Sequence, residues 1–296
     1  MVIFQANGAA LAHAAGFDQD AVTVWWQAWS WQPLPLLGTL LAASIYSVGL
    51  TRLWRHVGIG RGVGRWQAGC FGVGVVALLL ALISPIDTLA AHLGWVHMIQ
   101  HTLLMLVAAP LLVAGSPALV SLWAMPRRSS RPLGRSLVRL RLPTASRYLL
   151  WQPLAVWLLF TLMLWLWHLP KLYDLALRNQ FVHDVQHLAF LLGACLYWRV
   201  VVDPLGRVRL TAPLAVVYLF TMSLQGMFLG VFMALSPRLW YQHYADTTDA
   251  WGLAPLTDQQ IAGYIMWMPS CAIYAVVAVF IFGSWLHRSA EAEHAE

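Results

Sequence analysis

The segment HMIQHTLLMLVAAPLLVAGSP, residues 97–117, is the strongest indication of the fold class. Its apolar run is close to the roughly 20 residues that an α-helix needs to cross a bilayer. It begins with His97 and His101, two ionisable side chains at the point where a membrane helix should start. A second segment, VHDVQHL (182–188), repeats the HxxQH pattern at the head of another apolar run. The two segments predict two membrane helices, each with a histidine pair at one end.

The composition of the chain indicates a polytopic membrane protein. The 296 residues are 60% hydrophobic and only 10% charged, against roughly 25% charged residues in soluble domains, and the mean hydropathy is +0.65. The 17 tryptophans are typical of the aromatic belts at the two lipid–water interfaces. The net charge of +6 does not indicate nucleic acid, because the basic residues fall in short loops. The three cysteines form no CxxC motif, so we expect neither a disulfide framework nor a thiolate metal site.

Seven apolar runs predict an all-α bundle of about seven transmembrane helices. The expected spans are approximately 34–52, 68–86, 95–114, 149–168, 182–202, 213–235 and 261–286. They divide the chain into an extracytoplasmic N-terminal segment (1–32), a transmembrane domain (33–287) and a cytoplasmic tail (288–296). The start of the chain lacks the basic region of a cleavable signal peptide.

The Lys and Arg residues predict the orientation of the bundle. Fifteen of the 18 follow the first, third, fifth and seventh spans, and three lie on the opposite side. Cytoplasmic loops carry such an excess, so we expect the N-terminus outside and the C-terminus in the cytoplasm. The densest basic stretch, 127–147, is interpreted as a topology determinant, with an amphipathic segment on anionic lipid as the alternative.

An internal duplication is suggested by two sets of residues in the same order. The offsets between the sets are 86 or 87 residues: Asp87, His97, His101 and Pro117, then Asp174, His183, His187 and Pro204. Both sets start on the predicted outer side and run inward. This pattern favours a parallel repeat of one helix–loop–helix unit.

Five histidines gather at one depth of the predicted bundle, in its outer third: His97, His101, His168, His183 and His187. Residues at i and i+4 share a helix face, with Cβ atoms roughly 5–6 Å apart, so each HxxQH pair can bind one metal ion. A lone interfacial histidine is usually an amphipathic anchor, but polar groups inside a bilayer are costly and mostly functional. We therefore predict a metal or cofactor site made by the two pairs, with His168 as an additional ligand.

Copper is the metal that the surrounding side chains favour. Met105 continues the stripe of His97 and His101 one turn further inward, and imidazole with thioether suits copper, thioether favouring Cu(I). The methionines of the sixth and seventh spans are interpreted mainly as core filling. Four polar residues are candidates for orienting the imidazole rings: Asp87, Asp174, Gln100 and Gln186. Asp258 is expected in the N-cap region of the seventh span.

Four segments in a fixed order are distinctive: HMIQHTLLMLVAAPLLVAGSP (97–117), WHLPKLYD (167–174), FVHDVQHLAFLLGACLYW (181–198) and DQQIAGYIMWMP (258–269). Together they resemble the CtaG-type cytochrome c oxidase assembly factors, the integral-membrane family of Bacillus-type oxidases. The resemblance covers about residues 35–286. It implies a multi-pass protein of the bacterial plasma membrane that helps to form active haem–copper oxidase through copper delivery to subunit I or II. The family's HxxQH positions match both histidine pairs, and its WH-LP element matches His168.

Other classes of function stay open at this stage. The familiar catalytic motifs, such as HExxH, GxSxG and the Walker loop, are absent, so we expect a binding and transfer protein rather than an enzyme. A haem protein would need histidines on opposite faces of a porphyrin. A di-iron enzyme of the histidine-box type usually adds an HxxHH element, which the sequence lacks. A transporter would need a polar path to the cytoplasm, and a metal-free docking scaffold for the oxidase is the remaining alternative.

Overall fold

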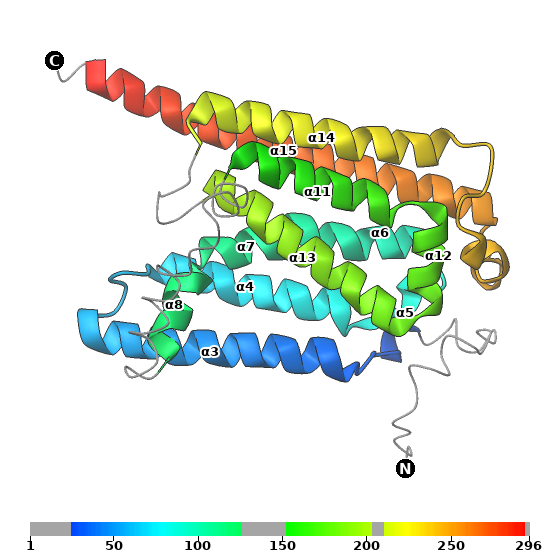
Figure 1. Ribbon diagram of the computed structural model, residues 1–296, viewed down its shortest axis with the longest axis horizontal. Helices are drawn as coiled ribbons and strands as arrows, with labels where there is room; N and C mark the ends of the chain where they lie inside the picture. The colour runs from blue at the N-terminus through cyan, green and yellow to red at the C-terminus, as the bar shows by residue number, and fades with distance from the viewer. Residues whose placement is uncertain (1–24, 126–151, 203–209, 294–296) are drawn as a thin grey trace, which may run out of the picture.

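The computed structural model describes residues 25–125, 152–202 and 210–293, and over these ranges the chain is a bundle of helices (Figure 1). The long helices are α3 (Pro33–Val57), α4 (Arg65–Leu82), α6 (Gly94–Thr102) continued by η2 (Leu103–Ala108) and α7 (Ala109–Ala114), α11 (Pro153–Trp167), α13 (Gln180–Val202), α14 (Ala212–Leu235) and α15 (Pro255–Glu293). The short helices are η1 (Trp25–Gln27), α5 (Pro85–Ala90), α8 (Pro117–Ala124), α12 (Pro170–Arg178), η3 (Gln242–Asp246) and η4 (Asp249–Trp251).

The number of membrane spans agrees with the sequence. Within the described ranges, six helices are long and apolar enough to cross a bilayer, and seven if α11 and α12, which meet at 72°, count as one broken span. The prediction of an all-α bundle with about seven spans is therefore confirmed. Large apolar side chains such as Leu41 on α3 and Phe280 on α15 are 62% and 74% exposed. Such surfaces are expected where a helix faces lipid rather than water.

Different short helices lie at the two ends of the bundle. Figure 1 shows α5 and α12 together at one end, which we call the α5/α12 end, and α8 at the opposite end. Arg52, near the end of α3, donates a hydrogen bond to the Ala124 carbonyl of α8 at 2.5 Å. The described arginines of the α3–α4 connection thus lie far from α5 and α12. The direction in which the bundle crosses the membrane stays a prediction, and the segments 1–24 and 127–147 lie outside the described residues.

The suggested duplication corresponds to a repeated helix pattern. Each histidine-bearing helix, α6 and α13, follows a short helix that begins with a proline, Pro85 or Pro170. Proline suits the first turn of a helix because its missing N–H would have no partner there. Both α6 and α13 begin at the α5/α12 end and run in the same direction (Figure 1). The two histidine pairs consequently enter the bundle at the same level.

The helix that begins with α6 contains one π-helical turn, η2, at which the Ala109 N–H bonds to the Leu104 carbonyl. Pro110 follows and has no N–H to donate, so the Met105 carbonyl loses its helical partner. The Trp198 indole N–H of α13 donates to that carbonyl at 2.8 Å instead. This hydrogen bond connects α13 to the helix at Met105, one turn beyond His101.

Helices α14 and α15 cross at very short range. A Cβ built on Gly230 would lie 2.6 Å from the Gly263 carbonyl oxygen, and a Cβ on Gly263 would lie 2.5 Å from the Gly230 oxygen. Only glycine at both positions permits this approach, as in other close helix pairs of membrane proteins. Helix α15 also contacts α6, whose histidines belong to the site described next.

Candidate metal centre

Helices α6 and α13 bring the two histidine pairs together in the interior of the bundle. The four side chains are at most 6% exposed. The ring centroids of His97 and His183 are 5.2 Å apart, and those of His101 and His187 are 5.4 Å apart. The two rings of each pair also lie close together within their own helix: those of His97 and His101 have centroids 4.2 Å apart and are tilted by 60°. The pairs thus face each other across the α6–α13 contact, as the repeated motif predicts.

Three of these imidazoles have the geometry of a metal site. Single ring nitrogens of His97, His183 and His187 all lie within 4.8 Å of one another. The Nε2 atoms of His97 and His183 are 3.4 Å apart. Two nitrogens bound tetrahedrally to one ion at about 2.0 Å would be about 3.3 Å apart, so little movement is needed. The three donors are imidazoles, which suit copper or zinc rather than magnesium or calcium.

Two tyrosine hydroxyls contact Nδ1 of the His97 ring, while its Nε2 faces His183. Its Nδ1 lies 3.1 Å from the Tyr244 hydroxyl and 2.9 Å from the Tyr173 hydroxyl. Burial raises the pKa of Tyr244 well above its usual value, so this group keeps its proton, which it donates to the Ala90 carbonyl at 2.9 Å. The Tyr244 oxygen can therefore accept from an Nδ1–H of His97. That tautomer leaves the Nε2 lone pair facing His183, as metal-binding histidines require.

Asp258 caps α6 rather than its own helix, which corrects the N-cap expectation. Helix α15 already begins at Pro255, so Asp258 lies inside its first turn. Its fully buried carboxylate accepts from the backbone N–H of Gly94 at 2.8 Å and of Trp95 at 3.4 Å. Leu93, the N-cap residue of α6, offers no side-chain acceptor, and an anion suits the helix N-terminus. A Cβ at position 94 would lie 2.8 Å from that carboxylate, so glycine permits the contact.

The four polar residues predicted to orient the rings occupy different environments. Asp87 accepts from Gln100 Nε2 at 2.7 Å and from Gln32 Nε2 at 2.8 Å, so it anchors α6 through Gln100. Asp174 accepts from the backbone N–H of His243 at 3.4 Å. Both amide atoms of Gln186 are buried and without a hydrogen-bond partner. The two halves of the repeat therefore support their histidine pairs unequally.

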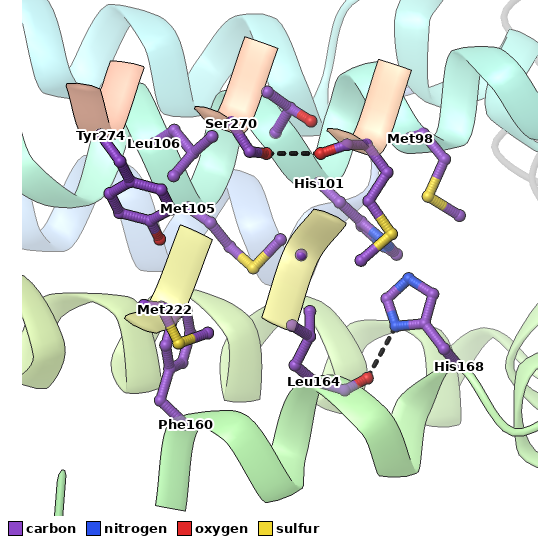
Figure 2. Close-up of a pocket in the computed structure, with 13 residues that line it drawn as sticks. Met98, His101, Met105, Leu106, Phe160, Leu164, His168, Met222, Ser270 and Tyr274 are labelled. Atoms are coloured by element: carbon purple, nitrogen blue, oxygen red, sulfur yellow. Dashed lines mark hydrogen bonds between the residues drawn. The ribbon is translucent and has the colours of Figure 1, made fainter. Parts of the chain in front are cut away.

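His168 and Met105 lie at a small cavity beside the histidine pairs (Figure 2). The cavity has a volume of about 30 Å³, and four methionines contribute to its wall: Met98, Met105, Met222 and Met266. His101 lines it as well, with its ring centroid 6.2 Å from that of His168. The two residues predicted as additional ligands are thus adjacent to the pairs but border a space of their own.

Sequence reasoning missed several residues that shape the centre. Tyr173 and Tyr244 lie 76 and 147 residues from His97, and no periodic pattern connects them to it. Their only signal is the density of aromatic and polar residues in WHLPKLYD and in the 240–246 loop. Met98 was also not considered, although it is 1% exposed and lines the cavity.

The chemistry of the centre follows from its neutral, buried donors. A charged imidazolium would be costly in this apolar interior, and the neutral ring is the form that ligates a metal. The arrangement can hold a borderline or soft cation and release it without breaking a covalent bond.

Comparison with known proteins finds a matching family model and a relative of low identity. The family model of the cytochrome c oxidase caa3 assembly factor, Caa3_CtaG, matches residues 44–288. An uncharacterised protein of Mycobacterium leprae (strain TN) is 27% identical over 264 residues, which is 85% of this chain. The chain spans only 39% of the length of that relative. No solved structure matches the chain.

Proposed function

Because the chain belongs to the family of cytochrome c oxidase caa3 assembly factors, we propose that it serves oxidase assembly by holding copper at the histidine pairs. In this proposal the ion is held by His97, His183 and His187, with His101 alongside, and is handed to subunit I or II of the oxidase. The protein would act in the bacterial plasma membrane as a binding and transfer factor, without catalysis of its own.

The observation that carries the proposal is the close approach of imidazoles from two helices. His97 Nε2 and His183 Nε2 are separated by 3.4 Å, and His187 Nε2 is buried without a hydrogen-bond partner. Burying polar atoms without partners is destabilising, so an ion that ligates them would relieve the cost. Three imidazoles leave at least one coordination position open, as an exchangeable site requires.

The surrounding residues would control the ligands. The Tyr173 and Tyr244 hydroxyls would hold the Nδ1–H of His97, and the Asp258 cap would fix the first turn of α6 on which His97 lies. The ends of α5 and α12 lie near the start of α6 and α13 (Figure 1). Copper would therefore enter and leave at the α5/α12 end.

The rival functions fit these residues less well. A cavity of about 30 Å³ has no room for a porphyrin, and His97 and His183, at 5.2 Å between centroids, leave no slot for one between them. A di-iron enzyme of the histidine-box type usually adds an HxxHH element, which the sequence lacks. A metal-free docking surface would have no use for imidazoles that are buried.

The test is the metal content of the detergent-purified protein after loading with Cu(I) or Cu(II). We expect wild type to retain copper through dialysis and the His97→Ala/His183→Ala variant to lose it. A matched control is His56→Ala/His287→Ala, which removes two exposed imidazoles far from the pairs. If the wild type binds no copper in either oxidation state, the copper proposal is wrong.

A second measurement separates delivery from binding alone. In cells that express an oxidase, the His97→Ala/His183→Ala variant should leave the oxidase poor in copper, while the control variant should restore normal copper content. Normal copper in the oxidase with the first variant would contradict a delivery role even if the purified protein binds the ion.

A further inference from the structure

We infer that the bundle contains a second metal position, specific for Cu(I), in the cavity formed by His101, His168 and the methionines Met98, Met105 and Met266. This inference extends the proposed function and rests on it for the identity of the metal. It assigns His101 to the second position rather than to the three-imidazole group. The protein would then hold two copper ions in neighbouring positions.

His101 is set apart from the other three histidines of the pairs. The group whose nitrogens lie within 4.8 Å of one another contains His97, His183 and His187, and not His101. The His101 side chain is only 1% exposed, and both of its ring nitrogens are buried without a hydrogen-bond partner. Because an unsatisfied buried nitrogen is destabilising, a ligand for this ring is expected.

His168 offers one nitrogen with a defined direction. Its Nδ1 lies 2.7 Å from the Leu164 carbonyl, which can only accept, so this nitrogen carries the proton. Its Nε2 is therefore an unprotonated lone pair, and it is buried without a partner. Metal-binding histidines usually donate one ring N–H to a carbonyl or carboxylate and bind the metal through the other nitrogen. His168 has the first of these contacts, and its Nε2 is available for the second.

The distance between these two rings suits one ion between them. With metal–nitrogen bonds of about 2.0 Å, each ring centroid lies about 3 Å from the ion, so two imidazoles on opposite sides have centroids about 6 Å apart. The observed separation of His101 and His168 is 6.2 Å. The rings are close to perpendicular, at 80°, so they do not stack and do not exclude an ion from the space between them.

Thioethers supply the rest of the ligand set. Figure 2 shows the His101 and His168 rings at one end of the cavity with Met98, and Met105 pointing its sulfur into the cavity. Met266 lines the same space from α15. Met222 is a weaker candidate, because its sulfur already accepts from the Thr161 hydroxyl at 3.7 Å. Neutral thioether and imidazole donors in an apolar cavity favour Cu(I) over Cu(II) and over zinc.

The cavity is of the right size for an ion and little else. Its volume of about 30 Å³ corresponds to roughly one or two waters. Its lining contains no carboxylate, so a doubly charged ion would be poorly compensated there. Its histidine on α6, His101, lies one turn beyond His97, about 6 Å along the axis.

The inference is tested by counting Cu(I) ions on the full-length protein in detergent, with Cu(I) titrated under anaerobic, reducing conditions against a chromophoric chelator. Three variants are compared with wild type: His97→Ala/His183→Ala for the first position, Met105→Leu/His168→Asn for the second, and Met233→Leu as control. Met233 is fully buried on α14 but does not line the cavity. X-ray absorption at the copper edge then reports whether sulfur is a ligand.

The outcomes separate the two proposals. If both hold, wild type binds two Cu(I), each double variant binds one, and only Met105→Leu/His168→Asn loses the sulfur signal. If wild type binds one ion that only His97→Ala/His183→Ala removes, and no sulfur is seen, the second position is wrong and the proposed function stands. If wild type binds a single sulfur-ligated ion, and that ion survives in His97→Ala/His183→Ala but is lost in Met105→Leu/His168→Asn, the cavity position stands and the three-imidazole site is wrong. Loss of an ion in Met233→Leu would show that the cavity variants act through packing and would overturn the assignment.

Discussion

The two tyrosine hydroxyls at His97 lead to a quantitative prediction about copper affinity. Tyr173→Phe and Tyr244→Phe each remove one oxygen that lies 2.9 or 3.1 Å from His97 Nδ1. In either single variant the other oxygen still accepts the Nδ1–H. The double variant leaves that N–H without an acceptor, and His97 is 0% exposed, so water cannot replace the lost hydroxyls.

The expected loss of Cu(I) affinity differs between the single variants, which keep one acceptor for the Nδ1–H, and the double variant, which keeps none. A single hydrogen bond contributes about 0.5–1.5 kcal/mol net, so each single variant should weaken Cu(I) binding by about 2- to 10-fold. An unsatisfied buried donor costs about 1–3 kcal/mol, and loss of the groups that orient a metal-binding ring typically weakens metal binding by about 10- to 100-fold. The double variant should therefore lose about 10- to 100-fold in Cu(I) affinity, more than either single variant.

The assay is competition for Cu(I) between the detergent-solubilised protein and a chelator of known affinity. Tyr218→Phe is the matched control, because the Tyr218 hydroxyl is buried but has no hydrogen-bond partner, and its removal should leave the affinity unchanged. A double variant that binds within about twofold of wild type would refute the reasoning, since His97 would then not ligate through an oriented Nε2.

Three further predictions concern the bundle itself. Asp258→Ala should lower stability by about 1–3 kcal/mol, because the first N–H groups of α6 lose their buried acceptor; an unchanged thermal midpoint would contradict the cap. Burial raises the pKa of Asp87 to about 6, so the folded protein holds this proton more tightly than the unfolded chain. Its contribution to stability should fall as the pH rises from about 4 through about 6, and Asp87→Asn should remove that slope from unfolding curves recorded across this range. Gly230→Ala should destabilise the protein by about 1–3 kcal/mol, because its Cβ would meet the Gly263 oxygen at 2.6 Å, whereas Gly38→Ala, with nothing within 4 Å, should not.

The membrane helices were predictable because bilayer thickness imposes their length and apolar content. The expected spans 95–114, 182–202 and 213–235 agree with the helices Gly94–Ala114, Gln180–Val202 and Ala212–Leu235 to within two residues. The short helix α12, which meets α11 at 72°, was not expected, because it is too short to be recognised as an apolar run of membrane-spanning length. The sequence also did not predict that α15 continues beyond residue 286. Its last residues are polar, so the apolar run that marks the span ends before the helix does.

The candidate site was predictable where local periodicity sufficed. An i, i+4 histidine pair marks one face of one helix, and the duplicated motif indicated that the two pairs lie at equal depth. The partners of these rings come from distant segments, as with Tyr244 at His97 and Asp258 at Gly94. Such contacts depend on how helices pack, which one sequence does not reveal. For the same reason, the methionines at the cavity could not be separated from core filling.

The π-helical turn at Leu103–Ala108 divides the histidine-bearing helix into two independently phased halves. A π turn is equivalent to one inserted residue, which rotates everything beyond it by about 100° relative to a continuous α-helix. The outer half is phased so that its histidines face α13, and the inner half so that its apolar face meets α4 and α13. In a continuous α-helix the inner half would be turned by that angle relative to the histidines. Deleting one residue from this turn would therefore reorient the packing face of the inner half and leave the imidazoles on the outer half where they are.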